Sequence, residues 1–110
     1  MNFRSQFRGL QRFLKVFYMI TQRLRVRGRV QGVGYRYALR HEAKRRGVAG
    51  WVRNRTDGSV EALLQGPAER VAEIVAWARS GPPASSVDDV EVAAADSEPT
   101  HAGFELRPSA

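Results

Sequence analysis

Segments with helical spacing alternate with strand-like segments along this 110-residue chain, and that order restricts the fold more than any other feature. Apolar residues recur at every third or fourth position over residues 36–46 and again over 67–80. Elsewhere in the chain after residue 22, they alternate with polar residues or form short runs bounded by turn residues. The pattern predicts two helices set among strands. At this length, these elements form one domain with a single modest core.

The clearest strand begins at Arg23, where apolar residues and arginines alternate without interruption. Such alternation is typical of a strand with one face in the core and the other exposed. The apolar face carries Leu24, Val26, Gly28 and Val30, and the other face carries Arg23, Arg25, Arg27 and Arg29. The arginine row is either a nucleic-acid-binding stripe or the polar outer face of a sheet that helices cover on one side. We prefer the second interpretation, because it is the commoner origin of this pattern.

Turn and cap residues place the other boundaries. Gly47 stops the first helix, the Asp57-Gly58 pair favours a hairpin, and Pro67 is expected as a first helical residue. Gly81 and the two prolines after it end the second helix. In chain order, the predicted elements are strand 23–30, loop 31–35, helix 36–46, strand 48–54, strand 59–65, helix 67–80, strand 87–95 and a short strand 104–107.

This order matches the split β-α-β motif of a ferredoxin-like α+β plait, which is β-α-β-β-α-β, here with a short extra C-terminal strand. We expect both helices on one face of a mixed, mainly antiparallel sheet. The first two strands should run parallel, with the third antiparallel between them. The loop after the first strand and the end of the second strand then share one end of the sheet. Residues 31–36 and Asn54 are therefore expected to be neighbours.

The loop before the first helix has the chemistry of an anion-binding site. Gly32 and Gly34 have no Cβ, so successive backbone N–H groups can turn toward one centre. The N-terminus of the helix adds unpaired N–H donors, and Arg36 adds a planar guanidinium suited to two phosphate oxygens. The spacing matches neither the Gly-x-Gly-x-x-Gly fingerprint nor a P-loop. On the loop alone, a glycine-rich turn without a ligand stays an alternative.

The first 18 residues differ from the rest of the chain. A helix there would carry basic residues beside an apolar stripe formed by Phe3, Phe7, Leu10, Leu14 and Phe17. Targeting and membrane-surface segments have this character. The alternative, which we prefer, is that Met19 is the true start and that the preceding residues are upstream or vector-derived sequence. We divide the chain into a basic amphipathic extension, residues 1–18, and a domain, residues 19–110.

Charge and composition limit the partners and the chemistry. The chain has 18 Lys and Arg against 11 Asp and Glu, and its net charge of +7 suits anionic partners such as phosphates or nucleic acid. It has no cysteine, which excludes disulfides and thiolate chemistry and is compatible with a reducing compartment. His41 and His101 are too few and too far apart to predict a zinc site. We expect no metal and no cofactor.

In chain order, five segments read GRVQGVGYR, GWVRNRTDGSVEA, LLQGP, SSVDDV and GFELR. Together these segments resemble the acylphosphatase family. The resemblance covers residues 22–107. It implies the same plait and a metal-independent enzyme that hydrolyses carboxyl-phosphate anhydrides. It also implies that Arg36 binds the phosphate and that Asn54 positions the attacking water. The phosphate-binding loop would comprise Gln31, Gly32, Val33, Gly34, Tyr35 and Arg36.

The side chains present also suit this substrate class. An acyl phosphate expels a carboxylate, whose conjugate acid has a pKa of about 4 to 5, so the leaving group needs little protonation at neutral pH. Orientation and charge stabilisation then suffice for a loose phosphoryl-transfer transition state. Asn54 can orient water without titrating, and a substrate phosphate oxygen is our hypothesis for the proton acceptor. We expect a monomeric cytoplasmic enzyme that releases inorganic phosphate.

Two non-catalytic interpretations stay open. The first is an RNA-binding plait that uses the basic sheet face, although the strands lack the aromatic run that stacks bases. The second is a domain that senses a small anion. Trp51 and Trp77 are expected to be packing residues, with a wall of the binding pocket as the alternative for Trp51. Arg53 and Arg55 either steer anions or are exposed charges near the hairpin.

Overall fold

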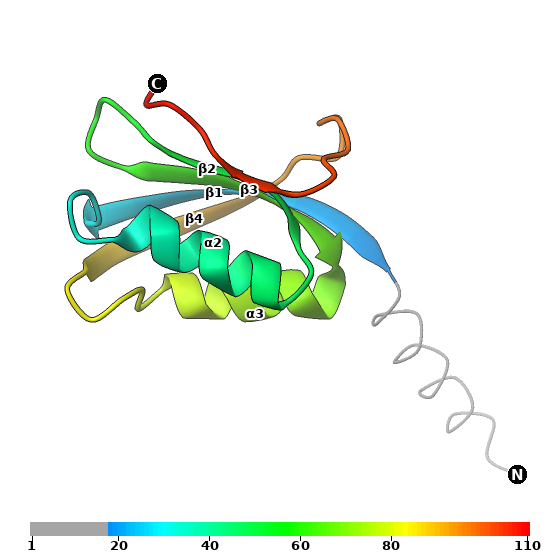
Figure 1. Ribbon diagram of the computed structural model, residues 1–110, viewed down its shortest axis with the longest axis horizontal. Helices are drawn as coiled ribbons and strands as arrows, with labels where there is room; N and C mark the ends of the chain where they lie inside the picture. Colours follow the sequence, from blue (N-terminus) through cyan, green and yellow to red (C-terminus); the bar gives the residue numbers. More distant parts are fainter. Residues whose placement is uncertain (1–17) are drawn as a thin grey trace, which may run out of the picture.

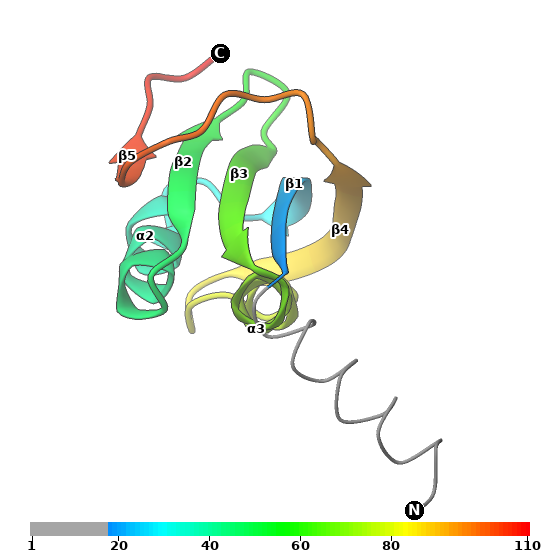
Figure 2. The same cartoon turned by 90° about the vertical axis from the view of Figure 1, so that its right-hand side faces the viewer.

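The computed structural model describes residues 18–110, which form a five-stranded sheet and two helices in the predicted order (Figure 1). The amphipathic helix considered for the first 18 residues lies outside the described residues except for Tyr18. Both helices cover the same face of the sheet, and no helix formed by residues 18–110 lies on the other face (Figure 2). The elements are β1 Met19–Arg29, α2 Tyr35–Arg45, β2 Ala49–Asn54, β3 Val60–Pro67, α3 Ala68–Ala78, β4 Ser86–Ala94 and β5 Phe104–Leu106.

The strands are arranged in the order β4-β1-β3-β2-β5. β3 pairs antiparallel with both β1 and β2, so β1 and β2 run parallel without sharing a hydrogen bond ladder. β4 adds antiparallel to β1, and β5 adds parallel to β2. This topology confirms the predicted α+β plait. It also confirms that the C-terminal ends of β1 and β2 lie at the same end of the sheet.

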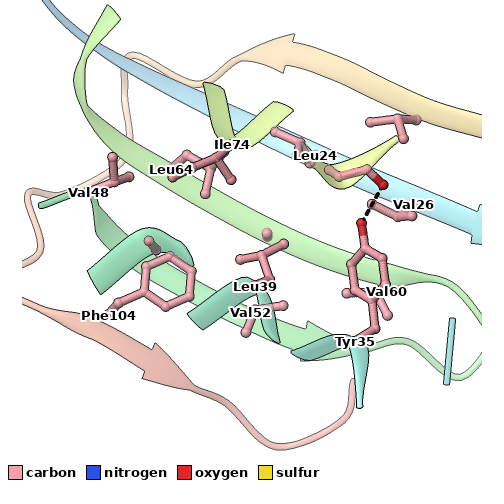
Figure 3. Packing of buried hydrophobic residues seen from close by; sticks show 14 of the residues in the cluster. Leu24, Val26, Tyr35, Leu39, Val48, Val52, Val60, Leu64, Ile74 and Phe104 are labelled. Atoms are coloured by element: carbon pink, nitrogen blue, oxygen red, sulfur yellow. Dashed lines mark hydrogen bonds between the residues drawn. The ribbon is translucent and has the colours of Figure 1, made fainter. Parts of the chain in front are cut away.

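The core lies between the two helices and the inner face of the sheet (Figure 3). Leu24 on β1, Leu39 on α2 and Ile74 on α3 are completely buried. Burial of each such side chain stabilises the fold by roughly 1.5–3 kcal/mol. The Tyr35 side chain extends across this core, and its hydroxyl donates a hydrogen bond to the carbonyl of Ala78, with an O···O distance of 2.8 Å. The start of α2 is thereby attached to the end of α3.

Two predicted boundaries are wrong at the end of the sheet away from the glycine loop. β1 begins at Met19 rather than at Arg23, because its first residues pair with the end of β3, Met19 opposite Pro67. Pro67 is accordingly the last residue of β3 and precedes α3, with φ −55° and ψ 137°. Proline at a strand end fits these angles and leaves no N–H unpaired. The other boundaries agree with the prediction within one or two residues.

The arginine row of β1 lies on the outer face of the sheet, where carboxylates pair with Arg23, Arg25 and Arg27. Arg27 lies 2.6 Å from Glu91, measured from Nη1 to Oε1, and Arg23 pairs with Glu98. The carboxylate of Glu61 has three partners, with N···O distances of 3.5 Å to Arg25, 2.7 Å to Arg53 and 3.4 Å to Arg55. This charge pairing agrees with a polar outer face rather than a free cationic stripe.

Trp51 is a packing residue of this outer face. It is buried in a small cluster with Leu63 and Ala95. The guanidinium carbons of Arg53 and Arg107 lie 4.8 and 4.7 Å from its ring centroid. Successive residues of a strand point to opposite faces, so Trp51 and Asn54 on β2 lie on opposite sides of the sheet. The alternative of Trp51 as a pocket wall beside Asn54 is therefore wrong.

Replacing Glu61 with glutamine is expected to destabilise the fold by about 1–3 kcal/mol at neutral pH, because three arginines lose their shared carboxylate. Burial acts to raise the pKa of Glu61, but the hydrogen bond from Arg53 and the charges of the arginines outweigh it and hold the pKa below its usual range. A carboxylate with a lowered folded-state pKa stabilises the fold above its unfolded-state pKa. That contribution disappears as the pH falls through the folded-state pKa.

The stability difference between wild type and Glu61→Gln should therefore shrink at acidic pH, as measured by chemical denaturation at a series of pH values. Glu91→Gln is the control, because the Glu91 side chain is 62% exposed whereas that of Glu61 is 6% exposed. The control should change stability little at any pH. A difference for Glu61→Gln that stays constant from neutral to acidic pH would contradict the prediction.

Candidate active site

The loop between β1 and α2 turns its glycines outward and its larger side chains inward. Val33 packs against the core, and Tyr35 is almost completely buried. Gly32 and Gly34 are exposed. Any contact that Val33 or Tyr35 makes with a ligand on the outer side of the loop would therefore use the backbone N–H group rather than the side chain.

Gly32 and Gly34 both adopt the left-handed backbone conformation, with φ of 72° and 80°. A Cβ added at either position would meet no atom within 4 Å. Glycine is therefore required here by the backbone conformation and not by crowding. The same open space leaves the backbone of this loop accessible to a small ligand.

Helix α2 begins at this loop without a side-chain cap. Gly34 is the N-cap residue, no acidic residue lies in the first turn, and the first helical hydrogen bond runs from Ala38 N to Gly34 O at 3.0 Å. The N–H groups of the first turn thus lack intrahelical acceptors and carry the positive end of the helix dipole. Together with the glycine loop, they can bind an anion.

Arg36 adds a full positive charge to this helix start. Its side chain is half-buried and forms no ion pair with any residue in the part of the chain that the structure describes. The guanidinium carbon lies 5.9 Å from the ring centroid of Tyr37, within the range of a cation–π contact. Arg36 differs in this respect from Arg25, Arg53 and Arg55, which share the carboxylate of Glu61.

Asn54 is the last residue of β2 and is half-buried. Its backbone carbonyl accepts a hydrogen bond from Ala110 N at 3.1 Å. Its side-chain oxygen Oδ1 is buried, and none of residues 18–110 donates a hydrogen bond to it. A buried amide oxygen without a donor costs about 1–3 kcal/mol, so this atom favours a small hydrogen-bond donor such as water.

A side-chain contact places the glycine loop beside the hairpin that follows Asn54. The amide nitrogen Nε2 of Gln31 lies 2.8 Å from the carbonyl oxygen of Arg55 and 2.9 Å from that of Ser59. The loop and the end of β2 are thus brought together as expected, although they are about twenty residues apart in sequence. The Gln31 side chain points to the hairpin, which leaves its backbone N–H group for any ligand of the loop.

Two structural features of this site were not predicted from the sequence. One is the side chain of Gln31, and the other is the C-terminal segment 107–110, which continues past β5 alongside β2. Arg107 N donates to Val52 O at 2.9 Å, and Thr56 N donates to Ala110 O at 3.0 Å, so the segment borders Asn54. The GFELR motif predicted a strand here, but no local signal identifies β2 as its partner.

The other candidates lie outside this site. Arg53 and Arg55 pair with Glu61, and Trp77 packs against the core, 5.5 Å from Tyr35 between ring centroids. Residues 18–110 contain no group of three or more side chains able to hold a metal ion. Neither helix of this part of the chain is long and apolar enough to cross a membrane.

Comparison with known proteins identifies relatives of this chain. The family model described as acylphosphatase matches residues 22–106. The acylphosphatase of Azoarcus sp. is 58% identical over 87 residues, which is 78% of this chain and 87% of that protein. The acylphosphatase of Thiobacillus denitrificans is 53% identical over 81% of this chain and 98% of its own length. The crystal structure of acylphosphatase from Bacillus subtilis superposes with a TM-score of 0.77 at 42% identity, over 80% of this chain and 98% of that chain.

Proposed function

Since this chain belongs to the acylphosphatase family and hydrolyses acyl phosphates to a carboxylate and inorganic phosphate, we propose that Arg36, the loop 31–36 and Asn54 form its active site. One observation carries the proposal. Within residues 18–110, an uncapped, cationic helix start and an amide whose buried oxygen has no donor belong to different elements and lie at the same end of the sheet. This arrangement offers one position for a phosphoryl group and another for water.

The phosphoryl group of the substrate binds in the loop. The backbone N–H groups of residues 31–36 donate to its oxygens, and the guanidinium of Arg36 holds two of them. The loop and the helix start fix the backbone N–H groups before the substrate arrives, so these donors need little reorganisation as charge develops. The main contribution of this part of the site is to neutralise the equatorial oxygens in a loose transition state.

The attacking water binds to Asn54. The side-chain amide can accept a hydrogen bond from the water at Oδ1 and donate another from Nδ2, which fixes the direction of the lone pair that attacks phosphorus. The water's proton passes to a phosphate oxygen of the substrate. The P–O bond to the acyl group breaks on the opposite side, and the carboxylate leaves without protonation because its conjugate acid has a pKa of about 4 to 5.

An RNA-binding role for the sheet face is not favoured. Five arginines of the outer face, on β1, β2 and the hairpin, are paired with carboxylates: Arg23, Arg25, Arg27, Arg53 and Arg55. Trp51 is the aromatic residue of this face on β2, and it is only 3% exposed. A surface that stacks bases needs accessible aromatic rings and free positive charge.

Hydrolysis of acetyl phosphate by the purified chain tests the proposed function, and the same assay tests the domain division. We propose that residues 19–110 are the catalytic domain and that residues 1–18 are an extension that does not take part in catalysis. The full chain and a chain starting at Met19 should have similar kcat values and melting temperatures. Lack of turnover with several acyl phosphates would favour an anion-binding domain, and loss of folding on truncation would place the extension in the domain.

We further propose that the enzyme is a monomer of the cytoplasm. The absence of cysteine suits a reducing compartment. Size-exclusion chromatography with light scattering should give a mass near 12.3 kDa, the mass of one chain.

Incubation with EDTA is expected to leave kcat unchanged, because the proposed mechanism uses a guanidinium and backbone N–H groups where metal-dependent phosphatases use a metal ion. The measurement is acetyl phosphate turnover before and after dialysis against the chelator. Loss of activity that a divalent cation restores would show that a metal takes part.

A further inference from the structure

The side chain of Gln31 connects the glycine loop to both ends of the hairpin turn. Its Nε2 atom has two protons, and the two acceptors are the carbonyl oxygens of Arg55 and Ser59, at 2.8 and 2.9 Å. These carbonyls belong to the residues that open and close the turn between β2 and β3, because Arg55 N itself donates to Ser59 O at 2.8 Å. The side-chain amide of Gln31 therefore binds the residues at both ends of the turn.

The turn that Gln31 binds is itself well ordered by hydrogen bonds. Ser59 is buried, and both its backbone N and its hydroxyl donate to Asp57 Oδ1, at 2.9 and 2.5 Å. Asn54 precedes this turn directly and pairs with Val60 on the other side of it. A displacement of the turn relative to the glycine loop would therefore move Asn54 as well.

The sheet connects the two halves of the site only indirectly, because Val60 of β3 lies opposite both Val26 of β1 and Asn54 of β2, and the pairing of β1 with β3 ends at Val26, before the glycine loop. The glycine loop follows β1 and Asn54 ends β2, and these two strands are separated by β3. Among the residues that the structure describes, Gln31 supplies the side-chain hydrogen bonds between the loop 31–34 and the hairpin. Glutamine suits this task because it provides two donors without a charge, whereas a glutamate would repel both carbonyls.

We propose that Gln31 is a positioning residue, whose amide sets the distance and direction between the phosphoryl group in the loop and the water on Asn54. The inference rests on the roles proposed above for Arg36 and Asn54. In-line attack requires the reacting atoms at about 3–3.5 Å with aligned orbitals, and a displacement of about 1 Å can cost a hundredfold in rate. Gln31 thus acts on kcat through geometry, without contacting the reacting atoms by its side chain.

The test is Gln31→Met, which keeps the length of the side chain and removes both donors. Gln65→Met is the matched control, because Gln65 also joins two segments by two hydrogen bonds, from Nε2 to Pro99 O at 2.6 Å and from His101 N to Oε1 at 2.8 Å. Gln65 lies at the opposite end of the sheet, where it pairs with Thr21 and Ala49. Both variants should lower the melting temperature by similar amounts.

Only Gln31→Met should lower kcat, by about 10-fold to 100-fold, while the inhibition constant of inorganic phosphate changes less than about threefold. Equal kcat losses in both variants, or a normal kcat in Gln31→Met, would reduce Gln31 to a structural role. A phosphate inhibition constant that rises as much as kcat falls would make Gln31 part of the binding loop instead.

A double-variant cycle separates this inference from the proposed function. If Gln31 acts through the water on Asn54, Gln31→Met should have little further effect on kcat in an Asn54→Ala background. Full additivity of the two losses would overturn the inference while leaving the role of Asn54 intact. A normal kcat for Asn54→Ala alone would instead overturn the proposed function.

Discussion

Replacing Arg36 with alanine is expected to lower kcat/KM for acetyl phosphate by about a thousandfold or more, because it removes the side-chain cation of the phosphate-binding loop. The inhibition constant of inorganic phosphate should rise strongly in the same variant. The melting temperature should stay close to that of the wild type, since Arg36 makes no ion pair within residues 18–110. Steady-state kinetics, phosphate inhibition and thermal denaturation measure these three quantities.

Arg40→Ala is the matched control for this prediction. Arg40 lies one turn further along α2 and contacts the same Tyr37 ring, with its guanidinium carbon 5.3 Å from the centroid. It should keep near-normal kcat and phosphate inhibition. Arg36→Lys should lose most activity, because an ammonium cannot reproduce the two parallel hydrogen bonds of a guanidinium. Ordinary turnover and phosphate affinity in Arg36→Ala would reject Arg36 as the phosphate-binding residue.

Replacing Asn54 with alanine is expected to lower kcat by about a hundredfold to a thousandfold, while KM and the phosphate inhibition constant change much less. The side chain carries no charge, so its loss leaves the electrostatic attraction for the phosphoryl group in place. What is lost is the amide that orients the water. Asn54→Asp should be equally poor or worse, because a carboxylate near the bound phosphate repels it and cannot donate to the water.

Thr56→Ala serves as the control for Asn54→Ala. Thr56 lies two residues further on in the same hairpin, is exposed, and contacts the C-terminal segment through its backbone N–H, which alanine retains. Its kcat should be near normal. The kinetic pattern that would contradict the assignment is a joint rise of KM and the phosphate inhibition constant at normal kcat in Asn54→Ala, since Asn54 would then bind the phosphate.

Local patterns in the sequence were enough to predict the order of the elements and the topology. The alternation from Arg23 onward identified the inner face of β1, and Leu24 and Val26 are indeed completely buried. The start of β1 was placed too late because Met19 and the residues after it show no alternation. They are strand only because β3 extends to Pro67 and supplies a hydrogen-bonding partner.

The sequence by itself determined which residues form the glycine loop, because the positive φ of Gly32 and Gly34 and the exposed N-terminus of α2 follow from residue type and local spacing. The tertiary structure decided which distant residues they contact. The hydrogen bonds of Gln31 to the hairpin, the C-terminal segment beside Asn54 and the ion pair of Arg25 with Glu61 all join residues at least 24 positions apart. Periodicity shows which side of an element faces the core, but the partner across such a distance is set by how the elements pack together.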